Sequence, residues 1–184
     1  MKGKDVKIII PKRELKKRVK ELGAKISKDY AGKELILIGI LKGSFIFLAD
    51  LIRQIKIPHE VDFIAVASYG QEIEGSGAVR LIKDLSANIE GKNVIIIEDI
   101  VDTGLTLNFI RKNLLLRNPK SLEIVTLLDR KERRKVQVPI KYVGFAVPNE
   151  FVVGYGLDLG ERYRNLPYIA KVEGGKLTQR WFEL

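Results

Sequence analysis

Residues 93–107 constrain the fold of this chain more than any other part of its sequence. Positions 94–97 are Val-Ile-Ile-Ile, an apolar, β-branched run between polar neighbours, which is typical of a strand buried on both faces of a parallel sheet. An acidic pair and a short loop at 102–104 come next, and then apolar residues recur at helical spacing until the Asn-Pro pair at 118–119. The segment therefore predicts a strand, a loop and a helix. In an open α/β sheet, ligands bind at such a loop, beyond the carboxyl end of the strand.

The predicted loop combines a phosphate-binding helix start with acidic side chains. A helix N-terminus presents unpaired N–H groups and a partial positive charge, Gly104 lets the backbone approach a ligand closely, and Thr103 and Thr106 add hydroxyl donors. Three carboxylates lie within residues 98–102. They could accept hydrogen bonds from sugar hydroxyls, bind Mg²⁺ or take up a proton. A ligand that carries both a phosphate and a diol, such as a ribose 5-phosphate, fits this combination.

The same spacing rules predict the other elements of the chain. We expect helices over 11–31 and 45–55, and strands over 35–41, 61–68, 79–85 and 121–128. Lys42, Gly43 and Ser44 follow the first of these strands, where backbone amides and one positive charge could meet an anion. Residues 69–77 contain three glycines and little to bury, so they predict a hairpin loop.

Composition narrows the class of protein. A chain of 184 residues with 46% hydrophobic and 30% charged residues is typical of one globular domain with a sizeable core. No apolar run approaches the roughly 20 residues that span a bilayer, and no signal peptide is evident, so we expect a cytoplasmic protein. The chain has no cysteine, which excludes disulfides, thiolate nucleophiles and Cys-based metal sites. The net charge of +10 suits anionic substrates; nucleic-acid binding is the weaker interpretation because the basic residues are spread along the chain.

Residues 98–106, with the sequence Glu-Asp-Ile-Val-Asp-Thr-Gly-Leu-Thr, resemble the signature of type I phosphoribosyltransferases, in the form found in hypoxanthine-guanine phosphoribosyltransferases. The resemblance implies an α/β fold: a parallel twisted sheet with helices on both faces, a flexible lid hairpin and a small hood. All of these would belong to a single domain over 1–184, with a core at roughly 30–130 and a hood from both chain ends.

The resemblance also implies an activity. In purine salvage, the 5-phosphoribosyl group of 5-phosphoribosyl 1-pyrophosphate would be transferred to a 6-oxopurine, hypoxanthine or guanine, with Mg²⁺ as cofactor. The products would be IMP or GMP and pyrophosphate. Family members are dimers or tetramers, which implies a homodimer or homotetramer here.

Residue roles follow from the same resemblance. Glu98 and Asp99 would hold the ribose hydroxyls, directly or through Mg²⁺, and Asp102 would take the proton from nitrogen 7 of the purine. The 5-phosphate would be held by the loop and the helix start: Asp102, Thr103, Gly104, Leu105 and Thr106.

The remaining assignments concern the pyrophosphate, the lid and the base. Lys42, Gly43 and Arg164 would bind the pyrophosphate, and Ser68 and Tyr69 would belong to the lid. The residues expected at the purine are Arg130, Phe151, Val152 and Asp158, with Phe151 stacking on the base and Asp158 also serving as a metal ligand beside Glu98 and Asp99.

The sequence departs from the family pattern after the strand at 121–128. The family usually has a lysine at the position of Arg130, where it contacts the 6-oxo group of the purine. Arginine keeps the charge but changes the shape and the number of donors, and Lys131 is an alternative donor. Arg134 matches an arginine near the pyrophosphate.

Three other interpretations stay open. Relatives that prefer xanthine, adenine or orotate carry related loops, although the adenine and orotate forms usually differ at the position of Asp102. A pyrimidine-operon regulator shares the fold and binds RNA. A binding protein without catalysis is the third, and Asp102 argues against it because binding alone needs no base.

Overall fold

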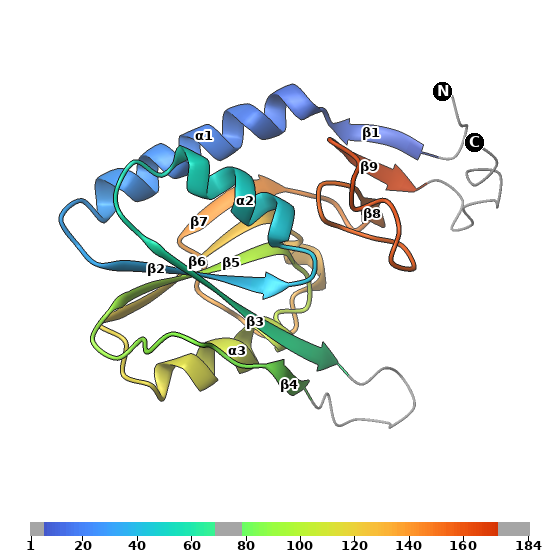
Figure 1. Cartoon of the computed structure of the whole chain (residues 1–184). Helices are drawn as coiled ribbons and strands as arrows, with labels where there is room; N and C mark the ends of the chain where they lie inside the picture. Colours follow the sequence, from blue (N-terminus) through green and yellow to red (C-terminus); the bar gives the residue numbers. More distant parts are fainter. Residues whose placement is uncertain (1–5, 69–78, 173–184) are drawn as a thin grey trace.

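A six-stranded sheet forms the centre of the molecule (Figure 1). The computed structural model describes residues 6–68 and 79–172. The strand order is β4-β3-β2-β5-β6-β7, and all neighbours are parallel except β3 and β4. The bounds are β2 (Leu35–Leu41), β3 (Glu60–Ser68), β4 (Val79–Lys83), β5 (Asn93–Val101), β6 (Ser121–Asp129) and β7 (Tyr142–Ala146). The prediction of a parallel α/β sheet is confirmed.

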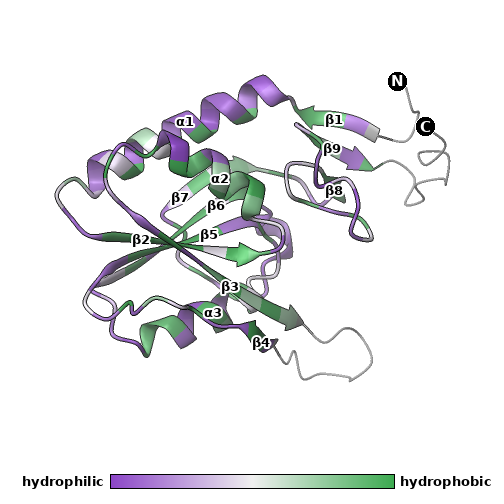
Figure 2. Cartoon of the chain, in the orientation of Figure 1, coloured by the Kyte–Doolittle hydropathy of each residue, from purple (hydrophilic) through white to green (hydrophobic). Residues whose placement is uncertain are grey.

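Helices cover both faces of this sheet. Helices α1 (Lys12–Asp29) and α2 (Phe45–Gln54) lie on one face and α3 (Leu105–Leu115) lies on the other (Figure 1). Successive side chains of a strand point to opposite faces, so Leu37 of β2 packs under α1 and α2 whereas Ile38 packs under α3. Both faces are therefore apolar, which explains the continuous hydrophobic runs in the strands (Figure 2).

A second, small sheet brings distant parts of the chain together. Strand β1 (Val6–Ile10) pairs with β9 (Ile169–Val172), and β9 pairs with β8 (Val152–Val153), all antiparallel. The first and last described strands thus lie side by side (Figure 1). This is the part of the chain for which a hood was expected, and the division into core and hood stays a prediction.

Two strand ends differ from the prediction by more than one residue. Strand β5 runs on to Val101 because β6 is long enough to pair with it there, through Ile100 and Leu128 among others. Glu98 and Asp99 therefore lie inside the strand. Strand β4 ends at Lys83, two positions short of the predicted end at 85, and the chain then turns in a bend at residues 86 and 87.

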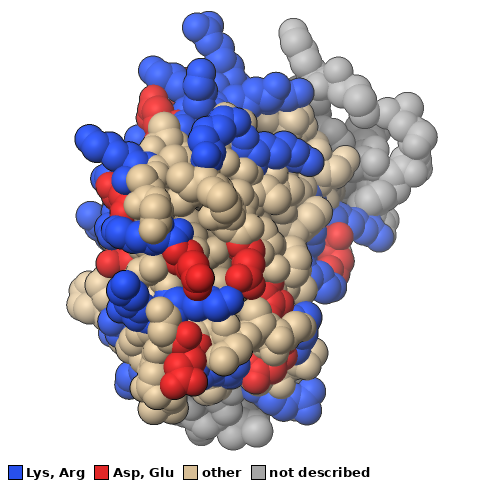
Figure 3. Space-filling model, turned by 60° about the vertical axis from the view of Figure 1, so that its left-hand side comes forward, with Lys and Arg blue, Asp and Glu red and all other residues tan. Residues whose placement is uncertain are grey.

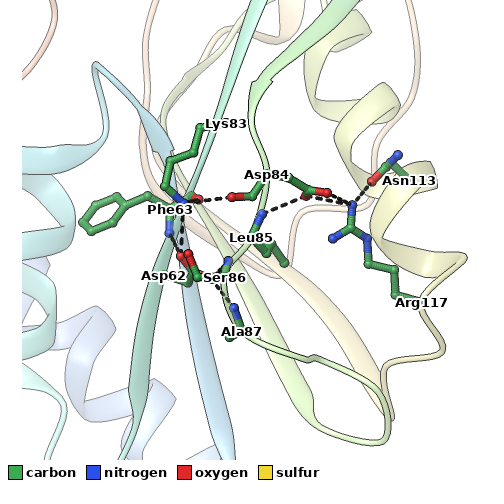
Figure 4. Close-up of polar contacts among 9 residues, drawn as sticks. All are labelled: Asp62, Phe63, Lys83, Asp84, Leu85, Ser86, Ala87, Asn113 and Arg117. Carbon is green, nitrogen blue, oxygen red and sulfur yellow. Dashed lines mark hydrogen bonds and ion pairs between the residues drawn. The ribbon is translucent and has the colours of Figure 1, made fainter.

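A buried aspartate fixes this turn (Figure 4). The carboxylate of Asp62, in β3, accepts hydrogen bonds from the backbone N–H groups of Phe63, Ser86 and Ala87 at 2.7–2.8 Å. Lys83 Nζ lies 3.5 Å from the same carboxylate. Burial acts to raise the pKa of Asp62, but these donors outweigh it and the pKa is lowered. The segment after β4 is thereby tied to β3, the neighbouring strand.

Charged side chains cover much of the surface. Lys and Arg side chains are numerous on the face shown in Figure 3, with Asp and Glu side chains between them. Among the described residues, no helix is long and apolar enough to cross a membrane.

Candidate active site

The loop between β5 and α3 forms a small cavity at the carboxyl edge of the sheet. Gly104 has φ +82° and precedes the first residue of α3. A Cβ at this position would lie 2.5 Å from the carbonyl oxygen of Val136, so glycine is needed both for its left-handed backbone and for space. A cavity of about 140 Å³ lies here. Its lining comprises Glu98, Ile100, Val101, Asp102, Thr103, Gly104, Thr106 and Leu107.

Most residues expected at the ribose 5-phosphate line this cavity. Leu105 and Asp99 are not among them, and the side chain of Leu105 is exposed. The carbonyl oxygen of Thr103 accepts hydrogen bonds from the N–H groups of Lys135 and Val136, at 2.9 and 3.1 Å. The loop is therefore held open around a space that faces a helix N-terminus, where an anion is favoured.

Asp102 is held by two arginines through one of its oxygens. Arg130 Nη1 lies 3.4 Å and Arg133 Nη1 lies 3.1 Å from Asp102 Oδ2. The other oxygen, Oδ1, is buried and has no hydrogen-bond partner among the described residues. Since carboxylate oxygens away from water normally find donors, this atom is the one prepared to accept a proton or a hydrogen bond from a ligand.

Arg133 was not predicted. It belongs to the charge run after β6, in a short 3₁₀-helix (η1, Lys131–Arg133). The sequence signal was its place in the charge run shortly after a predicted strand, since the carboxyl ends of parallel strands meet at one edge. That this strand, β6, neighbours β5 is seen in the structure.

Arg130 joins the Asp102 loop to the segment between β7 and β8. Its side chain is 7% exposed, and its guanidinium donates to the carbonyl oxygens of Pro148 and Glu150 as well as to Asp102. Phe151, which follows Glu150 in the chain, is 52% exposed, so its ring is accessible. Val152 is buried and pairs with Lys171 across the small sheet. The structure thus places Arg130 between Asp102 and the segment expected to bind the base.

Two further basic residues of this run, Lys131 and Arg134, do not pair with the Asp102 carboxylate. Lys131 is exposed and lines a separate cavity of about 310 Å³. Arg134 forms a buried ion pair with Asp129, and its guanidinium also donates to the carbonyl oxygens of Asp102, at 3.1 Å, and Val101, at 3.4 Å. The guanidinium of Arg134 is thus engaged by protein groups and holds the backbone of the Asp102 loop.

Glu98 and Asp99 point to opposite faces of β5. Glu98 lines the cavity near α3, whereas Asp99 lies against the loop after β2, where a Cβ at Gly43 would be 1.6 Å from Asp99 Oδ2. Burial, with the nearby Asp99, raises the pKa of Glu98 well above its usual range. Burial also raises the pKa of Asp99 to about 6, against the opposing effects of the Ile100 N–H and the charge of Arg164. Neither carboxylate therefore has enough donors to compensate for its burial.

A third group of charges lies between the loop after β2 and the loop after β8. Lys42 Nζ is 2.8 Å from Glu161 Oε2. Arg164 Nη2 is 2.9 Å from Asp158 Oδ1 and 3.3 Å from Glu161 Oε1. A Cβ at Gly156 would lie 2.0 Å from the carbonyl oxygen of Gly43, so the two loops are in direct contact.

This arrangement brings three predicted residues together with one that was missed. Lys42, Asp158 and Arg164 were expected at the pyrophosphate and the metal, whereas Glu161 was not. No local pattern marks Glu161, because its partner Lys42 is 119 positions away. Lys42, with Arg164 as the second cause, holds the pKa of Glu161 below its usual value.

The carboxylates fit a cation that is shared with a substrate. No group of three or more metal-ligating side chains occurs among residues 6–68 and 79–172. Mg²⁺ is commonly bound through one or two carboxylates plus substrate phosphates. Asp99, with its raised pKa, and Asp158, whose charge contributes to that rise, suit such a site because a nearby cation would compensate both.

The lid assignments fall at the edge of the described structure. Ser68 is the last residue of β3 and pairs with Val79 of β4. Tyr69 lies outside the described residues.

The model of the phosphoribosyl transferase domain family matches residues 5–159. The chain belongs to this family. It is 52% identical over 169 residues to a hypoxanthine phosphoribosyltransferase of Salmonella typhimurium, with 91% of this chain and 95% of the relative covered. A hypoxanthine-guanine phosphoribosyltransferase of Bacillus subtilis is 49% identical, with 92% and 94% covered. A crystal structure of a hypoxanthine phosphoribosyltransferase from Staphylococcus aureus is 50% identical, with 91% of each chain covered and a TM-score of 0.87.

The resemblance to hypoxanthine-guanine phosphoribosyltransferases is thus confirmed, and the chain is a phosphoribosyltransferase. The matched domain ends just before Gly160. Glu161 and Arg164, which complete the third group of charges, therefore lie beyond the part of the chain that the family model matches.

Proposed function

We propose that this phosphoribosyltransferase serves purine salvage by transferring the 5-phosphoribosyl group of 5-phosphoribosyl 1-pyrophosphate to hypoxanthine or guanine. The products are IMP or GMP and pyrophosphate. The names of its relatives support this reaction. The observation that carries the proposal is Asp102, which is oriented by arginines through Oδ2 and keeps a buried, unpartnered Oδ1 next to a phosphate-sized cavity.

The ribose 5-phosphate occupies the cavity between β5 and α3. Backbone N–H groups at the start of α3, with Thr103 and Thr106, donate to the phosphate. Leu105 contributes its backbone N–H only, since its side chain is exposed. Glu98, which lines the same cavity, accepts hydrogen bonds from the ribose hydroxyls.

The pyrophosphate lies over the loop after β2. Lys42 and Arg164 supply positive charge. Gly43 has no side chain, so its backbone can come close to the pyrophosphate, and any side chain at this position would strike Asp99. As the bond from ribose to pyrophosphate breaks, negative charge grows on the leaving group, and cations placed in advance stabilise it.

Asp158 and Asp99 are the residues that would hold Mg²⁺ together with the substrate, whereas Glu98, also expected as a ligand, lies on the other face of β5. An ion held there would supply positive charge that compensates the charge of the departing pyrophosphate. The chain contributes the carboxylates, the flanking Arg164 and a partly buried setting.

Asp102 acts as the general base. As nitrogen 9 of the purine attacks the ribose carbon, the proton on nitrogen 7 passes to Asp102 Oδ1 and pyrophosphate leaves with the bonding electrons. General base assistance contributes on the order of 10²- to 10⁴-fold. Arg130 and Arg133 hold Oδ2, so the carboxylate turns its free oxygen to the base.

The purine lies beside Arg130. The exposed ring of Phe151 stacks on the base, the backbone at Val152 pairs with the base edge, and Asp158 lies at its other side. Arg130 has N–H groups beyond those it uses in the protein, because a guanidinium carries five, and these donate to the 6-oxo group. Ser68, at the end of β3, serves as a lid residue.

Further parts of the proposal concern the setting of the enzyme. The enzyme acts in the cytoplasm, as a homodimer or homotetramer, and nucleic acid is not a partner. The location follows from the substrate, since charged sugar phosphates do not cross membranes unaided.

The test is a nucleotide-formation assay with Mg²⁺, 5-phosphoribosyl 1-pyrophosphate and, separately, hypoxanthine, guanine, xanthine and adenine. We expect turnover with the 6-oxopurines and none with adenine. No turnover with any base, in folded protein that still binds the phosphoribosyl donor, would contradict the proposal. Retention of RNA that falls steeply with salt would then favour a regulator.

A further inference from the structure

Glu161 joins the two cations that the proposed pyrophosphate site uses. Its Oε2 lies 2.8 Å from Lys42 Nζ, and its Oε1 lies 3.3 Å from Arg164 Nη2. Lys42 follows β2 and Glu161 follows β8, so only the folded chain brings them together. A single carboxylate therefore occupies both cations at once.

The backbone holds this carboxylate in place. Glu161 has φ +67°, in the left-handed region that side-chain-bearing residues rarely adopt. Its N–H donates to Asp158 Oδ2 at 2.9 Å. The side chain is 63% exposed, so a ligand that reaches Lys42 also reaches Glu161.

The charges of this group balance only in the absence of a ligand. Two cations, Lys42 and Arg164, face two carboxylates, Asp158 and Glu161. When substrate binds, Asp158 can act as a metal ligand, since carboxylate oxygens bind Mg²⁺. Among the described residues, Glu161 contacts the two cations through its carboxylate and Asp158 through its N–H. A pyrophosphate group placed on the same cations would meet the negative charge of Glu161 at close range, which is unfavourable.

We propose that Glu161 is an internal competitor of pyrophosphate, which neutralises Lys42 and Arg164 in the ligand-free chain and is displaced when the pyrophosphate group binds. The inference rests on the proposed function. It makes Glu161 a residue that limits the affinity for both the phosphoribosyl donor and the product pyrophosphate. When the product leaves, the carboxylate returns to the cations and favours release.

The test compares Glu161→Gln with the wild-type chain by titration calorimetry. The ligands are pyrophosphate with Mg²⁺ and, separately, 5-phosphoribosyl 1-pyrophosphate with Mg²⁺, both at low salt. We expect the Kd for each ligand to fall about two- to fivefold, the range that exposed ion pairs support. The gain in affinity should shrink at high salt because of screening.

Glu60→Gln is the matched control. Glu60 is 58% exposed and lies 2.9 Å from Lys92, so the substitution removes the same charge from a similar ion pair. Glu60 begins β3, at the opposite end of the parallel strands from the site. We expect its Kd values to stay within about 1.5-fold of wild type, because charges this far apart are largely screened.

Three results would overturn the inference. Unchanged or weaker binding by Glu161→Gln would mean that Glu161 does not compete, and weaker binding would mean that it holds the cations in place. An equal gain in affinity in Glu60→Gln would show that the effect comes from the net charge of the protein and not from the position of Glu161. A gain that persists undiminished in a Lys42→Met background would show that it does not pass through Lys42.

The wild-type titration separates this inference from the proposed function. A wild-type chain that binds neither ligand would contradict the proposed function and, with it, the inference. A wild-type chain that binds both ligands, with no gain in Glu161→Gln, would contradict the inference alone.

Discussion

Asp62 in β3 and Asp99 in β5 are two shielded aspartates of the same sheet with opposite electrostatics. Asp62 accepts three backbone N–H groups and lies near Lys83, and its pKa is lowered. Asp99 accepts a hydrogen bond from the N–H of Ile100, and burial raises its pKa to about 6. A complete set of donors turns a buried carboxylate into a structural anchor, whereas an incomplete set leaves it prepared for a ligand.

The place of each residue in the sheet explains the difference. The turn after β4 folds back over Asp62 and brings the N–H groups of Ser86 and Ala87 to it (Figure 4). Asp99 lies near the carboxyl end of β5 against the loop after β2, where Arg164 and Asp158 are the charged side chains that act on its pKa. Stability and function are thus separated between two strands of one sheet.

The largest effect should come from the unpartnered carboxylate of the active site. In Asp102→Asn we expect kcat to fall by about 10²- to 10⁴-fold, because the amide cannot take the proton. Affinity for 5-phosphoribosyl 1-pyrophosphate should stay within about threefold, since the phosphate loop is retained. Steady-state kinetics and calorimetry measure the two quantities. Full kcat in this variant would remove Asp102 from the role of base.

Asp62→Asn should lower the stability of the fold and not act on the catalytic step. The amide group presents N–H donors to backbone N–H groups, so we expect the free energy of unfolding to fall by about 3 kcal/mol. Urea unfolding measures this loss. Asp84→Asn is the control from the same network: Asp84 is 48% exposed beside Arg117, and its loss should cost less than about 1 kcal/mol. Equal losses in the two variants would contradict the role of Asp62 as an anchor.

Asp99→Asn should instead raise the free energy of unfolding of the ligand-free chain. A pKa raised from 3.8 to about 6 means that the folded chain prefers the protonated form. Asp99 therefore costs no stability below pH 4, an increasing amount between pH 4 and pH 6, and its full penalty above pH 6. We expect Asp99→Asn to stabilise the ligand-free chain by on the order of 2 kcal/mol at pH 8 and not at pH 4.

Ligand should reverse the order of stability of the wild-type chain and Asp99→Asn. With Mg²⁺ and 5-phosphoribosyl 1-pyrophosphate present, the wild-type chain should gain more stability than Asp99→Asn, because binding to the folded state adds to stability. Thermal unfolding at both pH values, with and without ligand, provides the comparison. A variant that is less stable than wild type at pH 8 without ligand would place Asp99 with Asp62 among the anchors.

The smallest effect concerns the exposed partner of Asp102. Arg133 is 48% exposed, whereas Arg130 is 7% exposed. In Arg133→Gln we expect kcat to fall by no more than about fivefold, as for other exposed ion pairs. Arg130→Gln should cost more, because it also leaves the carbonyl oxygens of Pro148 and Glu150 without their donor. Equal losses in kcat would show that both arginines act only by charge.

The sequence by itself determined the order and type of the main elements, because apolar side chains in each segment must face a core. The strand over 35–41 and the helices near 11–31 and 45–55 agree with β2, α1 and α2 to within one or two residues. The loop at 102–104 was predictable for a different reason, because a glycine before a helix with carboxylates around it is a local pattern. The family follows from this local pattern.

Only the tertiary structure decided how the charges meet. Pairing with β6 extended β5 through the acidic residues, and the alternation of side chains then sent Glu98 and Asp99 to opposite faces. Arg133 reached Asp102 because β6 neighbours β5. Glu161 met Lys42 across 119 positions because the loop after β8 packs on the loop after β2. Such contacts depend on topology and on close backbone approach, which hydrophobic periodicity does not encode.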